Sequence, residues 1–342
     1  MKLEVLELDD PIIEADNAVF EACLLIAEDK LISDEAGYFG PESVVWKIFR
    51  EPCILLGGYR AIMLQMAHPA VAQGVEQSSS FRNDMIGRAR RTIQAMNSLI
   101  FGSKEQALKA ATIMHHIHHQ VKGVVPDGID SSWAGQRFRA NALDLKNWVG
   151  LTTFDTVIIY FEKFVRPLSS VEKEQLAQEG HTLALLCGLP PEYHHQTLES
   201  QIVLRDEIFA GDELVVADVA SGIVKDLFGV TPGSLDERIT YGLLPPAVRE
   251  LYQIPWSDAD QEAHEKLAQK ISFLNRSLPK AVRYIPAWYQ ANTRVLKANS
   301  DGGADSSGWL KQTELLGRSY LRLFGSNAVI EAVDSQENRP EA

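Results

Sequence analysis

Signals that start and stop helices recur along this chain, and they limit the folds that it can adopt. Ser103 with Gln106, and Ser169 with Glu172, have the spacing of capping boxes, in which two side chains satisfy free backbone N–H groups at a helix start. Gly188 follows one apolar run at the position where a helix commonly ends. No stretch shows the sustained apolar and polar alternation of strands. We therefore predict an all-α fold.

Apolar residues recur at helical spacing in a series of segments between these signals. The segments cover residues 11–31, 41–51, 54–67, 83–99, 103–121, 139–165, 169–186, 197–210, 213–228, 246–253, 259–273 and 308–324. The segment 54–67 is the most apolar, so we expect its helix to be buried on most sides. Residues 124–136 are rich in Gly, Pro, Asp and Ser and are expected to form a loop.

The charge balance argues against a nucleic-acid partner. Lys and Arg total 33 against 46 Asp and Glu, so the net charge is −13, and a small organic or apolar substrate is more natural. The N-terminus lacks the pattern of a secretory signal, and no apolar run reaches the length of a membrane span. Three cysteines without a CxxC motif fit reduced thiols. We expect a cytoplasmic protein without a transmembrane segment.

Five of the nine histidines lie between residues 57 and 123, and we expect any chemistry to be located there. His115, His116, His118 and His119 lie near the end of one predicted helix. Neutral imidazole binds transition metals and haem iron. Histidines at a helix end can also simply interact with its last carbonyl groups. Spacing alone leaves both interpretations open.

A second group of candidate residues lies on the preceding predicted helix. Arg88, Arg91 and Thr92 are spaced i, i+3 and i+4, which places two cations and a hydroxyl on one helix face. Such a face could bind the carboxylates of a cofactor or polarise bound oxygen, although surface ion pairs are the alternative. His68 stands before Pro69 and could bind a metal or serve as a hydrogen-bonded core residue.

Several other kinds of enzyme site lack support in the sequence. A di-iron carboxylate bundle needs two Glu-x-x-His motifs, and only Glu192 to His195 matches. The chain contains no HExxH, no GxGxxG after a strand, no phosphate-binding GxxxxGK[ST] and no GxSxG. Zinc proteolysis, nucleotide chemistry and α/β-hydrolase chemistry are therefore not favoured.

Four sequence blocks, taken in order, resemble one known family. They are QMAHPAVAQGVEQSSSF, GRARRT, MHHIHHQVKG and FRANALDLKNWVGLTTFDT. The resemblance spans about residues 41–209 and is to the latex-clearing rubber oxygenases and MpaB-type oxygenases. It implies a globin-like helical domain that binds haem b and uses O2 to cleave an isoprenoid double bond. We accordingly expect a helical extension over 1–40, a haem-binding domain over 41–325 and a flexible tail over 326–342.

The resemblance also implies roles for individual residues. The family's iron ligand is the histidine of H-x-x-V-x-G, which is His118 here, with His119 as the adjacent alternative. The family's Arg-x-x-Lys-Thr motif falls on Arg88, Arg91 and Thr92, so arginine replaces the lysine. A guanidinium stays protonated and cannot bind iron, whereas a lysine amine can.

The function implied is oxygenation of a small lipophilic, isoprenoid-like substrate by a haem enzyme. Arg88, Arg91 and Thr92 are the expected catalytic residues, and Arg88 and His68 are expected to contact the cofactor as well. Two alternatives remain open. The first is a protein that binds haem as a carrier or sensor without catalysis, and the second is a haemless helical interaction module.

Overall fold

The computed structural model describes residues 12–77, 84–194, 197–228, 235–279 and 283–299, and it confirms the all-α prediction. Within these ranges there are fourteen α-helices, two short 3-10 helices and one two-stranded sheet. The α-helices are α1 (Asn17–Glu28), α2 (Val44–Phe49), α3 (Gly57–Met66), α4 (Pro69–Gln77), α5 (Met85–Phe101), α6 (Lys104–His119), α7 (Leu143–Phe164), α8 (Ser170–Leu186), α9 (Leu198–Ala210), α10 (Asp218–Phe228), α11 (Leu235–Leu243), α12 (Pro246–Leu251), α13 (Asp258–Ser277) and α15 (Pro286–Asn299). The 3-10 helices are η1 (Pro52–Leu56) and η2 (Pro191–Tyr193), and the strands are β1 (Lys122–Val124) and β2 (Arg137–Arg139).

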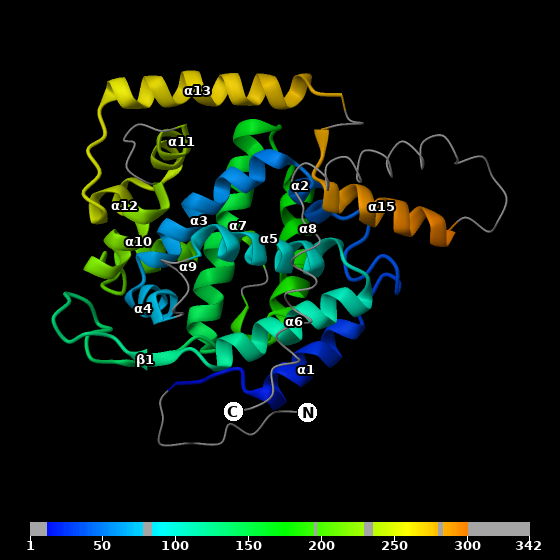
Figure 1. Ribbon diagram of the computed structural model, residues 1–342, viewed down its shortest axis with the longest axis horizontal. Coiled ribbons are helices and arrows are strands. Elements are labelled where there is room, and N and C mark those ends of the chain that lie inside the picture. Colours follow the sequence, from blue (N-terminus) through cyan, green and yellow to red (C-terminus); the bar gives the residue numbers. More distant parts are fainter. Residues whose placement is uncertain (1–11, 78–83, 195–196, 229–234, 280–282, 300–342) are drawn as a thin grey trace.

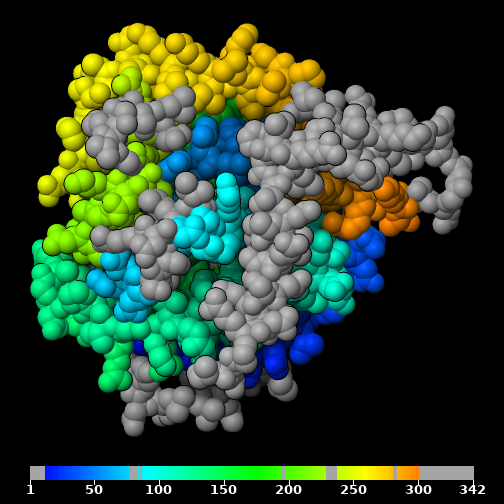
Figure 2. Space-filling view, viewed as in Figure 1, coloured from blue at the N-terminus to red at the C-terminus, as the bar shows by residue number. Residues whose placement is uncertain are grey.

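Helices α7 and α8 run through the middle of the molecule (Figure 1). In this view, shown in space-filling form in Figure 2, α13 crosses one end of α7, while α6 and α1 lie toward the other end. Large apolar side chains of α7, including Trp148, Phe154 and Tyr160, are buried. A helix covered in this way needs apolar residues around most of its circumference, which α7 has. Helices α2, α3, α8, α9 and α13 pack against α7, which makes it a central element. None of the described helices is long and apolar enough to cross a membrane.

Helix α3 approaches α7 very closely, and a glycine permits this contact. A Cβ atom added to Gly57 would lie 2.9 Å from Cγ2 of Thr156 and 3.3 Å from the ring of Tyr160. These distances leave no room for a side chain unless the helices move apart. Gly57 thus sets the spacing between the two helices.

A buried ion pair joins the same two helices. Arg60 of α3 is only 1% exposed, and its Nη2 lies 2.7 Å from Oδ2 of Asp155 on α7. The guanidinium also donates to Thr156 Oγ1 and to the carbonyl oxygen of Leu243, each at 2.7 Å. The other oxygen of Asp155 accepts from Arg205 of α9 at 2.6 Å. Arg60, a polar residue in the most apolar predicted helix, is therefore a structural link among α3, α7, α9 and α11.

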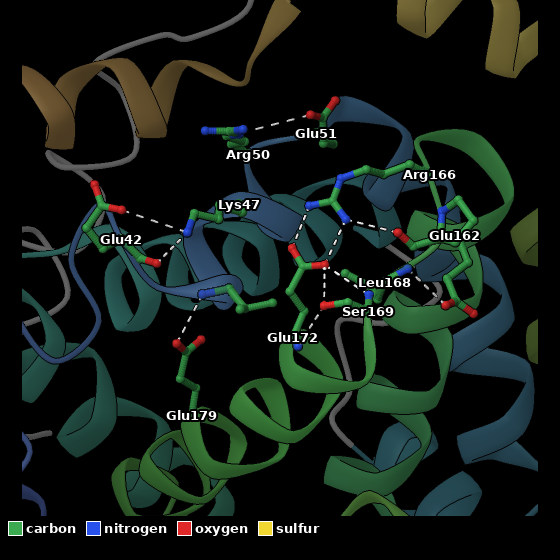
Figure 3. Close-up of polar contacts among 12 residues, drawn as sticks. Glu42, Lys47, Arg50, Glu51, Glu162, Arg166, Leu168, Ser169, Glu172 and Glu179 are labelled. Carbon is green, nitrogen blue, oxygen red and sulfur yellow. Dashed lines mark hydrogen bonds and ion pairs between the residues drawn. The ribbon is translucent and has the colours of Figure 1, made fainter.

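A carboxylate holds the start of α2 against α8. The two oxygens of Glu179 accept from the backbone N–H groups of Val44 and Val45 at 3.0 and 2.7 Å (Figure 3). The first N–H groups of a helix lack partners within it, and their partial positive charge favours an anion. Close by, Arg166 binds Glu172 through two nitrogens at 2.6 and 2.9 Å. These contacts fasten α2 and the end of α7 to α8.

The predicted helix starts are largely confirmed. Asp84 caps α5 by accepting from the backbone N–H of Gly87 at 3.0 Å. Both bonds of the capping box are present at Ser103 for α6 and at Ser169 for α8. Gly188, just after α8, has a φ of +77°, a backbone conformation that glycine adopts without strain. Local side-chain chemistry was therefore sufficient to place these boundaries.

Other boundaries differ from the predictions. The helix expected from residue 139 begins at Leu143, because residues 137–139 pair with β1 as an antiparallel strand. Pro69 starts α4, where we predicted no helix, since proline fits the first turn of a helix without losing a bond. Glu76 consequently lies in a helix and not in a loop. The sequence also gave no prediction for α11 and α15.

The domain boundaries at residues 40 and 325 stay predictions. Helix α1, in the expected extension, contributes Phe20 and Cys23 to the same apolar cluster as Trp46 of α2 and Phe161 of α7. The helix predicted over 308–324 and the tail over 326–342 lie outside the described residues.

Candidate functional site

His118 lies in the last turn of α6, and its environment differs from that of its histidine neighbours. Its side chain is partly buried, and its Nδ1 atom is buried without a hydrogen-bond partner. Burial, followed by the charges of Lys146 and Arg88, lowers the pKa of His118 to about 4. The imidazole is therefore neutral at pH 7. A neutral ring is the form that binds a metal, and a buried polar atom without a partner is uncommon in a native protein.

Arg88 approaches His118 from the first turns of α5. Its guanidinium is partly buried, and Nη1 donates to the carbonyl oxygen of Val75 on α4 at 3.3 Å. Burial, and next the charge of Arg91, lower the pKa of Arg88 from its ordinary value. Arg88 thus links the start of α5 to the end of α4, and its charge acts on His118 in the last turn of α6.

A second cation whose charge acts on His118 is Lys146 of α7. Its Nζ donates to the carbonyl oxygen of Cys187, at the end of α8, at 2.7 Å. Burial lowers the pKa of Lys146 to about 8. The sequence prediction did not include this residue, although its position between the apolar residues Leu145 and Trp148 was a visible signal. Two positive groups near a neutral imidazole can bind anionic groups such as carboxylates.

Arg91 and Thr92 lie at the surface, unlike Arg88. Both are exposed, and Nη1 of Arg91 lies 2.9 Å from Oδ2 of Asp84. This hydrogen bond with Arg91 is the main reason why the pKa of Asp84 is lowered. The structure thus places Arg88 beside His118 and places the other two residues of the predicted face in solvent. The catalytic roles of all three stay predictions.

The remaining histidines of the cluster have other environments. His115 is buried and stacks on Phe20 of α1, with ring centres 4.1 Å apart and an angle of 5° between the planes. Its Nε2 lies 3.0 Å from Oδ1 of Asn17. It therefore ties α6 to α1. His116 and His119 are exposed. Among the four, His118 alone has a buried nitrogen without a partner.

His68 occupies a buried position between α3 and α4. It is 3% exposed and meets the ring of Trp133 edge to face, with ring centres 4.8 Å apart. Its Nδ1 has no hydrogen-bond partner, and burial lowers its pKa to about 4. These features resemble those of His118 without the nearby cations. A contact with the cofactor stays a prediction.

The arrangement around His118 fits a haem better than a multi-ligand metal site. In the described part of the chain, no group of three or more His, Cys, Asp and Glu side chains is gathered as such a site requires. A haem needs a single histidine from the protein, because the porphyrin supplies the other four nitrogens. It also carries carboxylates that Arg88 and Lys146 could pair with. The residues present are consistent with this cofactor.

Comparison with known protein families gives one match. Residues 46–273 match the family described as "ER-bound oxygenase mpaB/B'/Rubber oxygenase, catalytic domain". Comparisons with curated proteins and with solved structures gave no match. The matched region covers about two thirds of the chain and contains Arg88, His118 and Lys146. The chain therefore belongs to the family of mpaB and rubber oxygenase catalytic domains, as its sequence blocks predicted.

Proposed function

We propose that this oxygenase is haem-dependent, with His118 as the protein ligand to the iron and a small lipophilic, isoprenoid-like molecule as the substrate. One observation carries the proposal: the neutral imidazole of His118 has a buried Nδ1 without a partner, in a chain of an oxygenase family. When bound, haem b would supply the iron centre that activates O2.

Three residues would hold the cofactor and set the polarity around it. His118 stays neutral at pH 7, so its lone pair is available without loss of a proton. Arg88 and Lys146 would pair with the two carboxylates of haem b. A guanidinium has five N–H donors, so the bond from Arg88 to Val75 is compatible with a further contact. Anions between two partly desolvated cations are bound more strongly than at an open surface.

Arg91 and Thr92 are proposed to act on the oxygen side of the site. Arg91 would first have to leave Asp84, and an exposed ion pair of this kind is worth only about 0–1 kcal/mol. The rearrangement is therefore inexpensive compared with the energy of a charge-assisted bond in a closed site. Once there, the guanidinium and the hydroxyl would donate hydrogen bonds to a bound oxygen atom.

His119 and His68 remain secondary candidates for cofactor contacts. His119 neighbours His118 in sequence but is exposed, so it is the alternative ligand. His68 would need to turn its unpaired Nδ1 toward the cofactor.

Cytoplasmic location is also a proposal, and it rests on the reduced thiols of Cys23 and Cys53. Both are free, buried thiols whose pKa is raised to about 12, mainly by burial.

The test uses the purified protein after haem reconstitution. An intense Soret band, O2 consumption with short isoprenoids and carbonyl products identified by mass spectrometry are the expected results. Absence of a Soret band would refute the haem proposal and favour a haemless interaction module. A Soret band without turnover over a broad lipophilic panel would instead favour a haem carrier or sensor.

A further inference from the structure

Two histidines face each other at a place remote in sequence from His118. His181 lies in α8, and His194 directly follows η2. Their Nδ1 atoms are 3.2 Å apart, their ring centres are 5.0 Å apart, and the ring planes are inclined by 71°. Neither residue is used by the proposed oxygenase site. The question is whether this contact is only an N–H···N hydrogen bond or a pair of ligands.

The spacing of the nitrogens fits two ligands of one metal ion. Imidazole nitrogens bind Zn²⁺ at about 2.0–2.1 Å, and other first-row divalent ions have similar bonds. With such bonds, the Nδ1 separation of 3.2 Å corresponds to an angle at the metal of about 103°. This angle lies between those of square-planar and tetrahedral coordination, the two geometries that Cu²⁺ and Zn²⁺ prefer.

The spacing of the ring centres separates the two interpretations. The centre of an imidazole ring lies about 1.15 Å from each nitrogen, so a linear hydrogen bond of this length would hold the centres about 5.5 Å apart. Two rings aimed at a shared ion would hold them about 5.0 Å apart. The observed separation is 5.0 Å. The contact is thus bent and not collinear, as two rings that share one ion would be.

The backbone holds both histidines in place. His181 is in the regular part of α8. After α8, the turn at Gly188 leads into Pro190 and Pro191, and proline restricts the backbone. The backbone N–H of His194 then donates to the carbonyl oxygen of Pro191 at 3.3 Å. Little conformational entropy remains to be lost when a ligand binds.

The surroundings of His181 disfavour its protonated form, which cannot bind a metal. The ring is partly buried, and burial, followed by the charge of Lys30, lowers the pKa of His181. Both side chains are only partly buried, so an ion can reach them from solvent. Within the described ranges no third His, Cys, Asp or Glu completes the site. Water or a small anion would therefore fill the remaining positions.

We propose that His181 and His194 form a two-histidine site for a divalent transition-metal ion. Both rings would bind through Nδ1 and would link η2 to α8. Affinity should follow the usual order for nitrogen ligands, with Cu²⁺ bound more tightly than Ni²⁺ or Zn²⁺. Mg²⁺ and Ca²⁺ prefer oxygen ligands and should not compete.

The test is titration of the tag-free, haem-reconstituted protein with CuCl2, followed by calorimetry and electron paramagnetic resonance. We expect one tight Cu²⁺ per chain, with hyperfine splitting from two imidazole nitrogens. His181→Ala and His194→Ala should each weaken this binding at least tenfold. His116→Ala is the matched control, because His116 is an exposed histidine outside the pair, and it should bind as the wild type does.

Two further measurements keep the proposal open to refutation. Cu²⁺ should raise the unfolding temperature of the wild type and of His116→Ala but not of the two pair variants. If a pair variant fails to fold, the number of nitrogens in the wild-type spectrum still decides. The proposal is overturned if wild-type protein binds no Cu²⁺ tightly, if the spectrum shows no pair of nitrogens, or if the folded pair variants keep wild-type affinity.

Discussion

Replacing Asp155 with alanine should be among the most damaging single changes in the described core. Arg60 is 1% exposed and would keep its charge while losing the carboxylate of Asp155, which lies 2.7 Å from its Nη2. Removing one member of a buried ion pair typically costs about 3–5 kcal/mol, because the other charge is left uncompensated. Arg60 would retain bonds to Thr156 and to the carbonyl of Leu243. We therefore expect a loss of about 3 kcal/mol in the free energy of unfolding.

Replacing Arg60 should cost less stability than replacing Asp155, and this difference tests whether Arg60 depends on the carboxylate. Arg60→Met removes the buried cation itself, while Asp155 keeps Arg205 at 2.6 Å. The cost should then be about 1–3 kcal/mol, from the lost hydrogen bonds of Thr156 and Leu243. In the double variant the fully buried cation is gone, and Arg205 keeps Asp206 at 2.7 Å. Its cost should fall below the sum of the two single costs by at least about 1 kcal/mol.

Urea unfolding of the four proteins, prepared in the same way and in the same buffer, measures these differences. The account predicts that Asp155→Ala is the least stable single variant and that the double-variant cycle shows coupling. Additive costs, or a loss of under about 1 kcal/mol for Asp155→Ala, would contradict the description of a buried, mutually dependent pair.

Three further predictions concern packing, capping and pH. Gly57→Ala should cost about 1–3 kcal/mol in a urea titration because its Cβ would meet Thr156, whereas Gly58→Ala, with nothing within 4 Å, should be neutral or stabilising. Glu179→Ala should lower the free energy of unfolding by about 1–3 kcal/mol, because it leaves two backbone N–H groups of α2 without acceptors. Replacement of the exposed Glu174 with alanine is the control. Equal losses in the two variants would refute the role of Glu179 as the acceptor for α2. His68, with its pKa lowered to about 4 by burial, stays neutral in the folded state while the unfolded chain takes up a proton, so stability should fall as pH drops from 6.5 to 4. Between pH 6.5 and 4 the wild type should lose about 3 kcal/mol more of its free energy of unfolding than His68→Leu does. Parallel profiles of stability against pH for the two proteins would contradict this prediction.

The helices could be predicted from the sequence wherever a local signal fixes them. Ser103 and Ser169 begin α6 and α8 as expected, because capping depends on residues three apart in the chain. The start of α7 could not be predicted in this way. It depends on the pairing of residues 137–139 with β1, a contact across a loop that helical periodicity does not reveal.

The site could be predicted only in part. Four clustered histidines pointed to α6, and the family resemblance selected His118 among them; the role of His118 stays a prediction. The sequence could not show that His115 is used in packing against Phe20, since the partner is distant in the chain. Nor could helical spacing show that α5 buries Arg88 and exposes Arg91. Lys146 was missed because its burial arises from the end of α8, about forty residues later.

The haem ligand is the central point, and chemical rescue tests it most directly. Haem would be added to wild type, His118→Gly and His119→Gly, and the absorption spectra compared with and without free imidazole. The account predicts that His118→Gly loses the spectrum of the histidine-ligated haem and that imidazole restores it, while His119→Gly resembles the wild type. A wild-type spectrum from His118→Gly without imidazole would contradict the assignment of His118 as the iron ligand.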